Sequence, residues 1–161
     1  MTSAREWQSE IGRVLDEEIR AATKLLGILK TERETLKQRD MEALSRSGDA
    51  KHRILAELDA LDKDRLSLAE LAGIPADREG FGDFLESLHQ GDDIRLRWQR
   101  LVGLLEECQD RNEANGRLVA LQRDHVEKAL AALRGVDKQP GLYGPDGNQR
   151  HTGSGLPLSS A

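Results

Sequence analysis

The chain has 161 residues, which is enough for one domain with its own hydrophobic core. Ala, Glu, Lys, Leu and Arg account for 80 of them, a composition typical of long helices and coiled coils, and aromatic residues make up only 3%. The formal net charge of −5 argues against a nucleic acid partner, since proteins that bind phosphates concentrate lysine and arginine. We therefore expect an all-α fold, an elongated antiparallel bundle of three long helices, and no nucleic acid partner.

Cysteine content and hydropathy indicate the compartment. The one cysteine, Cys108, excludes an intramolecular disulfide and fits a reducing environment. The first residues, MTSAREWQSEIG, lack the basic patch and apolar run of a signal peptide. No apolar stretch approaches the roughly 20 residues that cross a bilayer. The sequence thus predicts a cytoplasmic protein without membrane insertion.

The first predicted helix spans residues 3–38. Ser3 and Glu6 have the spacing of a capping box, in which each side chain accepts from the other residue's backbone amide. Apolar residues then recur at spacings of three and four, and a heptad thread runs through Leu15, Ala22, Leu29 and Leu36.

The second predicted helix spans residues 41–72, with Asp40 as its N-cap. Gly48 and Asp49 interrupt its apolar stripe and predict a local bend. Gly73, followed by Pro75, ends the helix, because glycine suits the position after a helix and proline cannot continue the turn. The short connection makes the first two helices antiparallel neighbours.

A short helix is predicted at residues 81–89. Its apolar residues, Phe81, Phe84, Leu85 and Leu88, include both phenylalanines of the chain. We expect this segment to close the end of the bundle, and the alternative is a docking knob for a partner protein.

The last long helix is predicted at residues 93–134, with an aspartate as N-cap and Gly135 after its final turn. Its four–three apolar stripe carries amides at Asn112, Asn115 and Gln122. From Gly135 on, the chain holds six of the fifteen glycines and three of the four prolines. Residues 1–135 are thus predicted to form the helical bundle and residues 136–161 a flexible Gly/Pro-rich tail.

Motifs of catalysis are missing from the sequence. The four histidines stand far apart, and no paired-ligand spacing, phosphate loop, nucleophile elbow or Rossmann glycine pattern occurs. Cys108 falls on the apolar stripe, where a buried inert thiol is expected. The sequence predicts a protein that is not an enzyme and has neither cofactor nor metal.

The amides in the apolar stripe have two interpretations. Asn112 and Asn115 fix the register of the last helix against the hairpin, as buried amides do in coiled coils. Alternatively, the stripe beyond them is offered to another protein, because an exposed apolar helix face usually binds a partner helix. The residues of that candidate surface are Leu118, Val119, Val126, Leu130 and Leu133.

Two segments together carry a family resemblance. The run LLEECQDRNEANGRLV, followed by a helix end and then LYGPDGN, resembles the FlgN family of flagella synthesis proteins. An RDMEAL-like turn between the first two helices, a short connector and a Gly-rich tail agree with that family. The resemblance implies a cytoplasmic chaperone of flagellar type III export.

The resemblance also implies partners. FlgN-type chaperones bind the C-terminal helices of hook–filament junction proteins, prevent their premature association and deliver them to the cytoplasmic domain of the export gate. In the family the tyrosine of the YGxDG segment is implicated in docking at that gate. This places the docking segment at Tyr143, Gly144, Asp146 and Gly147.

Two alternatives remain at this point. One is a homodimeric coiled-coil adaptor whose apolar stripe pairs with a second copy of itself. The other is a chaperone for a different flagellar cargo, such as flagellin or the filament cap. The sequence leaves the oligomeric state open.

Overall fold

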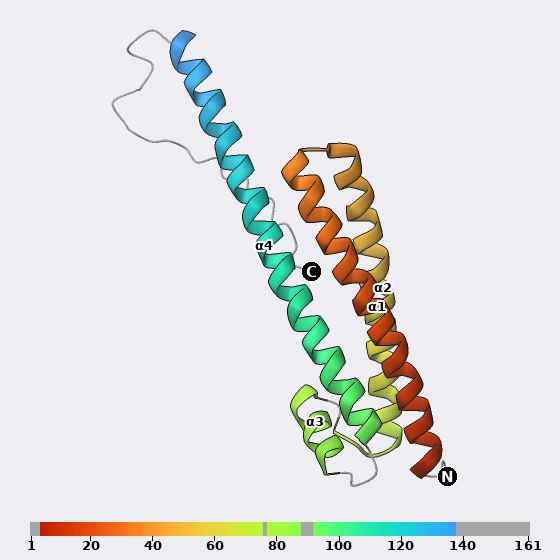
Figure 1. Ribbon diagram of the computed structural model, residues 1–161. Helices are drawn as coiled ribbons and strands as arrows, with labels where there is room; N and C mark the ends of the chain where they lie inside the picture. Colours follow the sequence, from red (N-terminus) through yellow and green to blue (C-terminus); the bar gives the residue numbers. More distant parts are fainter. Residues whose placement is uncertain (1–3, 76, 88–91, 138–161) are drawn as a thin grey trace. The chain divides into compact units, whose positions relative to one another are not determined.

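A computed structural model describes residues 4–75, 77–87 and 92–137 of the chain. Those ranges contain four helices and no strand, so the all-α prediction is confirmed. The helices are α1 (Ala4–Gln38), α2 (Met41–Leu71), α3 (Arg78–Glu86) and α4 (Asp92–Asp137) (Figure 1). The chain divides into two compact units, Met1–Ala120 and Leu121–Ala161, and α4 contributes to both.

A link of two residues joins α1 to α2. Arg39 takes a left-handed conformation (φ 55°). Its N–H donates to the Leu36 carbonyl over 3.2 Å, and the Asp40 N–H donates to the Thr35 carbonyl over 3.1 Å. The Asp40 carboxylate then accepts from the Ala43 N–H at 3.1 Å, which confirms Asp40 as the N-cap of α2. The chain reverses within this link, so α2 runs back beside α1 (Figure 1).

The end of α2 agrees with the sequence prediction. Gly73 has φ 71°, and its N–H donates to the Glu70 carbonyl over 3.1 Å. The Ile74 N–H donates to the Ala69 carbonyl over 2.8 Å, which completes a Schellman motif. Upstream, α2 is helical through Gly48 and Asp49, and the local bend expected there stays a prediction.

The predicted bounds of the short helix, 81–89, need correction. The Asp77 carboxylate accepts from the Gly80 N–H at 2.9 Å, so this N-cap starts α3 at Arg78 and the helix ends at Glu86. Phe81 and Leu85 are fully buried, and Phe84 packs partly buried against the same core. These contacts support the prediction that α3 closes the end of the bundle; Leu88 lies outside the described residues.

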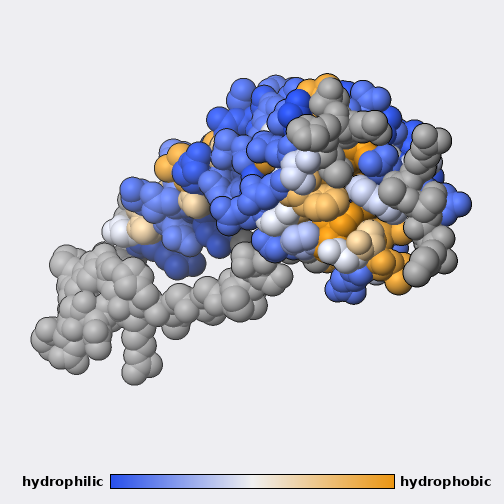
Figure 2. Space-filling view, turned by 90° about the horizontal axis from the view of Figure 1, so that it is seen from below, coloured by the Kyte–Doolittle hydropathy of each residue, from blue (hydrophilic) through white to orange (hydrophobic). Residues whose placement is uncertain are grey.

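The first unit holds two clusters of buried apolar side chains. The cluster nearest α3 joins all four helices and consists of Ile11, Leu15, Ile19, Ala22, Ala69, Ile74, Phe81, Leu85, Ile94, Trp98 and Leu101. The second cluster lies further along α1 and consists of Ala21, Leu25, Leu29, Ile54, Leu61 and Cys108. Each fully buried leucine or isoleucine contributes about 2 kcal/mol of transfer free energy. At the end of this unit that carries α3, Figure 2 shows apolar side chains gathered amid hydrophilic ones.

Helix α4 also differs from its predicted bounds. It continues through Gly135 to Asp137, because a glycine inside a helix costs only about 1 kcal/mol and the next proline is Pro140. The predicted N-cap at the Gly91–Asp93 corner falls partly outside the described residues, and Asp92 is already helical. Of the predicted tail, residues 138–161 lie outside the described part of the chain. Ser3, half of the predicted capping box, does so too.

Candidate functional site

Within the first unit, the apolar stripe of α4 is buried at most positions before the amides, and Leu105 is the exception at 40% exposure. Trp98 is 8% exposed, Leu101 1% and Cys108 4%. One turn after Asn112 the stripe reaches Asn115, which is also buried at 3% exposure. The polar interruption that the sequence shows is therefore part of the interior of the first unit.

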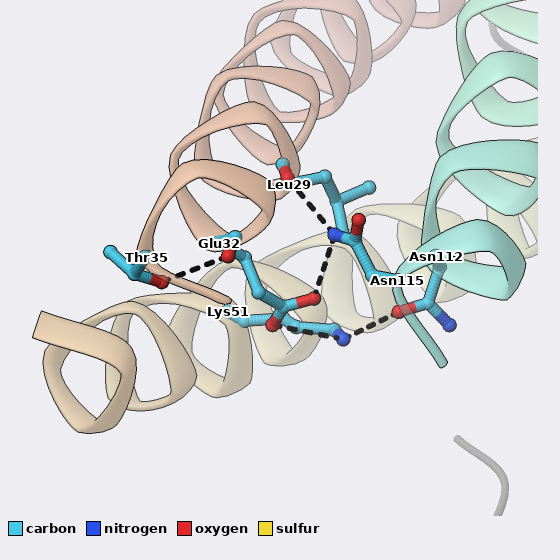
Figure 3. A network of polar contacts seen from close by, with 6 residues as sticks. All are labelled: Leu29, Glu32, Thr35, Lys51, Asn112 and Asn115. Atoms are coloured by element: carbon cyan, nitrogen blue, oxygen red, sulfur yellow. Dashed lines mark hydrogen bonds and ion pairs between the residues drawn. The ribbon is translucent and has the colours of Figure 1, made fainter. Parts of the chain in front are cut away.

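Asn115 holds α4 to α1 through its amide nitrogen. Nδ2 donates to the Leu29 carbonyl over 3.0 Å and to Glu32 Oε1 over 2.9 Å (Figure 3). Glu32 is itself only 9% exposed, and the Thr35 hydroxyl donates to its backbone carbonyl over 2.8 Å. An amide with both donors directed at a buried carboxylate and a carbonyl fits only one relative position of the two helices.

Lys51 brings α2 into the same network. Its ammonium lies 3.5 Å from Glu32 Oε2 and donates to Asn112 Oδ1 (Figure 3). Asn112 is half-buried. Together the two amides connect α4 to both helices of the hairpin, which supports the predicted role in register; that role stays a prediction.

The first unit contains a buried ion pair that the sequence analysis did not predict. Both carboxylate oxygens of Glu18 accept from Arg65 Nε at 3.2 Å, and both residues are less than a tenth exposed. Arg65 also contacts Asp62. Its guanidinium lies 4.9 Å from the Trp98 ring centroid and 5.3 Å from that of Phe81. Arg65 thus connects α2 with α1, α3 and α4.

Burial shifts the pKa of the Glu18 carboxyl. Loss of hydration raises the pKa of its carboxyl, and this outweighs the opposite effect of the Arg65 guanidinium. The nearby Asp62 carboxylate raises the pKa of Glu18 further.

The ion pairs follow the heptad pattern, which is the signal that could have revealed them. Glu18 and Glu32 are fourteen positions apart on α1, and their partners Lys51 and Arg65 are fourteen positions apart on α2. Both carboxylates fall within the apolar stripe, three positions after Leu15 and Leu29. Two charges at matched spacing pin the register of an antiparallel pair, because a slip of one heptad would separate both.

Cys108 behaves as expected of a structural thiol. It is buried, and its Sγ lies 3.6 Å from the Ala22 carbonyl, to which it donates. Burial raises the pKa of this thiol, and the Glu107 carboxylate adds to that effect. A buried, protonated thiol is a poor nucleophile.

In the second unit, the described part of α4 exposes its apolar side chains. Val126 is 51% exposed, Leu130 46% and Leu133 66%. They recur at spacings of four and three; Val126 and Leu133 stand in the same heptad phase as Trp98 and Asn112, and Leu130 lies one position after the stripe residue Ala129. Leu121 is also 66% exposed, nine positions before Leu130 and hence on the opposite side of the helix; we had not predicted it.

The remaining predicted site residues fall in two groups. Leu118 and Val119 belong to the first unit and are half-buried. The docking segment, Tyr143, Gly144, Asp146 and Gly147, lies outside the described residues.

Comparison with known proteins agrees with this helical arrangement and with the two sequence segments. The family model described as FlgN protein matches residues 1–151. The chain belongs to the FlgN family.

Relatives of this FlgN-family chain are named flagella synthesis protein FlgN. The protein from Yersinia enterocolitica is 29% identical over 138 residues, covering 84% of this chain and 86% of the relative. The one from Proteus mirabilis is 28% identical over 147 residues, covering 89% and 92%. A crystal structure of a FlgN-type flagella synthesis protein from Pseudomonas aeruginosa matches with a TM-score of 0.60 and 29% identity, covering 66% of this chain and 84% of that one.

The described residues of this FlgN-family chain offer no metal site. Within 4–75, 77–87 and 92–137, no three His, Cys, Asp or Glu side chains lie close enough to hold a metal ion together. In the same ranges no helix is both long and apolar enough to cross a membrane.

Proposed function

We propose that this FlgN-family protein is a cytoplasmic chaperone of flagellar type III export. In this proposal it binds the C-terminal helices of hook–filament junction proteins, prevents their premature association and delivers them to the cytoplasmic domain of the export gate. Membership of a family whose relatives are named flagella synthesis proteins supports the proposal.

The observation that carries the proposal is the exposed apolar stripe of α4. Val126, Leu130 and Leu133 repeat the spacing of the buried part of the helix, yet about half or more of each side chain is exposed. Exposed apolar side chains at heptad spacing favour binding of an amphipathic partner helix. Leu118 and Val119 are half-buried, so we expect them to contribute less.

Cargo binding is tested by titration calorimetry with the C-terminal segment of a hook–filament junction protein. The full chain should bind, and Leu130→Glu should weaken binding at least about tenfold, since a charge then faces the apolar partner. Leu121→Glu is the matched control, because Leu121 is at least as exposed but faces the other way. Equal binding by both variants and the unchanged chain would contradict the proposed surface.

Gate docking is tested separately. The variant Tyr143→Ala should keep its affinity for the junction-protein segment and lose its affinity for the cytoplasmic domain of the export gate. Tyrosine is suited to this role, because it buries a large area with little loss of conformational entropy. Unchanged gate binding would remove Tyr143 from the proposal.

The two alternative functions predict different results. A homodimeric adaptor would show a concentration-dependent mass near twice 17.9 kDa and no affinity for any flagellar cargo. A chaperone for flagellin or the filament cap would bind those proteins more tightly than the junction-protein segment.

A further inference from the structure

A groove runs between α1 and α2 on the side of the hairpin that α4 does not cover. Its volume is about 650 Å³, within the range of pockets that hold ligands. Gly27 and Thr31 line it from α1. Each lies two positions from Leu29, which is buried and whose carbonyl accepts from Asn115 of α4, and two positions turn a helix by about 200°. The groove therefore faces away from α4.

The floor of the groove is built mainly from small residues. Gly27 lines it on α1, and Ala43, Ser47 and Ala50 line it on α2. Spacings of four and three place the three α2 residues on one face of that helix. Because the distance between packed helices depends on the side chains at the contact, such short side chains let another helix approach closely.

Ser47 presents a polar group that has no partner in the described residues. The residue is only 7% exposed, yet within the described ranges its hydroxyl forms no hydrogen bond. The hydroxyls of Thr23 and Thr35, by contrast, donate to carbonyls of their own helix over 2.7 and 2.8 Å. The Ser47 oxygen keeps access to the groove that the residue lines. Since buried hydroxyls are normally hydrogen-bonded, this one is available to a group that enters the groove.

Both rims of the groove carry a cation. Lys24 lies on the α1 side and Arg46 on the α2 side, and no carboxylate of the described residues lines the groove, although the whole chain has a net charge of −5. Within the same ranges neither cation forms an ion pair, whereas Lys51 and Arg65 of α2 do. An apolar floor between two cationic rims complements a helix with carboxylates on both sides of its apolar face.

A second copy of this chain does not offer such a helix from its exposed stripe. One flank of Val126 and Leu130 carries Arg123, Glu127 and Arg134. The arginines of that flank would meet the cations of the groove, so the charges favour a different partner.

We propose that the groove between α1 and α2 docks an acidic amphipathic helix of a partner protein, whose carboxylates pair with Lys24 and Arg46 and accept from the Ser47 hydroxyl. The groove shares no residue with the stripe proposed for cargo, so the two proposals can fail independently.

The test uses the full chain and a dye-labelled synthetic peptide with blocked ends. The peptide spans about three heptads, with alanine and leucine on one face and glutamate along both flanks. Its counterpart carries glutamine in place of each glutamate. The glutamate peptide should show a saturable rise in fluorescence anisotropy at millimolar protein concentration or below, and the glutamine peptide should bind at least about fivefold more weakly. Equal affinity for both peptides, or no saturable response, would overturn the proposal.

Charge variants locate the site. Lys24→Gln with Arg46→Gln should weaken binding of the glutamate peptide at least about fivefold, while Lys63→Gln with Arg123→Gln removes the same charge outside the groove without effect. Leu130→Glu should also leave this binding unchanged. Loss of binding in Leu130→Glu would place the peptide on the stripe of α4 and overturn the proposal.

A steric variant tests whether the groove itself is occupied. Gly27→Leu should abolish binding by filling the groove, while Gly116→Leu, at an exposed helix glycine outside it, should not. Unchanged binding by Gly27→Leu would overturn the assignment. So would a dimer of the free chain that Gly27→Leu dissociates, because the occupant would then be a second copy.

The hydroxyl of Ser47 is tested by its removal. Ser47→Ala should weaken binding of the glutamate peptide about threefold or more, without lowering the midpoint of urea unfolding, because the free protein gives this hydroxyl no partner within the described residues. Ser67→Ala is the matched control on an exposed part of α2 and should leave binding unchanged. Equal binding by both variants would remove Ser47 from the proposal.

Discussion

Two stretches of α4 share one apolar periodicity and differ in what surrounds them. From Ile94 to Asn115, five stripe residues are less than a tenth exposed (Ile94, Trp98, Leu101, Cys108 and Asn115), Asn112 is half-buried and Leu105 is 40% exposed. Further along the helix, Val126, Leu130 and Leu133 are about half exposed or more. The difference teaches that heptad spacing specifies which face of a helix is apolar but not what covers that face.

The largest loss of stability is expected at Arg65, whose buried charge lies beside Trp98 in the covered stretch of α4. Arg65→Met removes the cation beside Trp98 and leaves the Glu18 carboxylate without its partner, which should lower the free energy of unfolding by about 3–5 kcal/mol at neutral pH. Urea unfolding followed by circular dichroism measures it.

This loss should depend on pH in a defined direction. Without Arg65, burial and Asp62 raise the pKa of Glu18 further above its ordinary 4.5. A raised folded-state pKa means stability that is present below pH 4.5 and lost as the pH rises through the folded-state value. The free energy of unfolding of Arg65→Met should therefore be closest to that of the unchanged chain near pH 4.5 and furthest below it at neutral pH. Adding Glu18→Gln should remove that dependence; if it persists, Glu18 is not its source.

Alanine variants of one leucine in each stretch of α4 should differ clearly in stability. Leu101→Ala should lower the free energy of unfolding by about 3 kcal/mol, because it leaves a cavity in the core. Leu133→Ala should change it by no more than about 0.5 kcal/mol, since that side chain is 66% exposed. Chemical unfolding of both variants gives the two values. A similar loss in both would show that the exposed stripe is covered in solution.

An intermediate effect is expected at the last buried position of the stripe. Asn115→Ala removes both hydrogen bonds to α1 and leaves the Glu32 carboxylate short of a donor, so unfolding should become about 1–3 kcal/mol easier. Asn112→Ala should cost less, because Asn112 is half-buried and Lys51 keeps Glu32 as a partner. The two variants are compared by thermal and urea unfolding. A larger loss at Asn112 would place the main polar contact on α2.

The smallest changes in stability are expected from helix propensity alone, at one glycine in each stretch of α4. A Cβ at Gly116 or at Gly135 meets no atom within 4 Å. Gly116→Ala should stabilise the folded protein by about 0.5–1 kcal/mol. Gly135→Ala should raise helix content by circular dichroism and leave the midpoint of urea unfolding unchanged. A shift of that midpoint would show that residues near Gly135 unfold together with the core.

Several parts of the fold follow from local chemistry that the sequence displays. Asp40 and Gly73 were predicted as helix ends because a capping carboxylate and a left-handed glycine act within one turn of the chain. The bounds of α3 were wrong because Asp77, four positions before the first phenylalanine, also caps a helix. The FlgN resemblance rested on two short segments at a fixed order, and the family model confirms it.

The sequence by itself determined the helices, the apolar face of each and the family. Only the tertiary structure decided which charges were buried and which apolar residues were left exposed. Glu18 and Arg65 belong to different helices 47 positions apart, so only their packing distinguishes them from surface charges. Val126 and Leu130 have the spacing of a core, and only the absence of covering side chains among the described residues leaves them exposed. Periodicity is a property of one helix, whereas burial is a property of its neighbours.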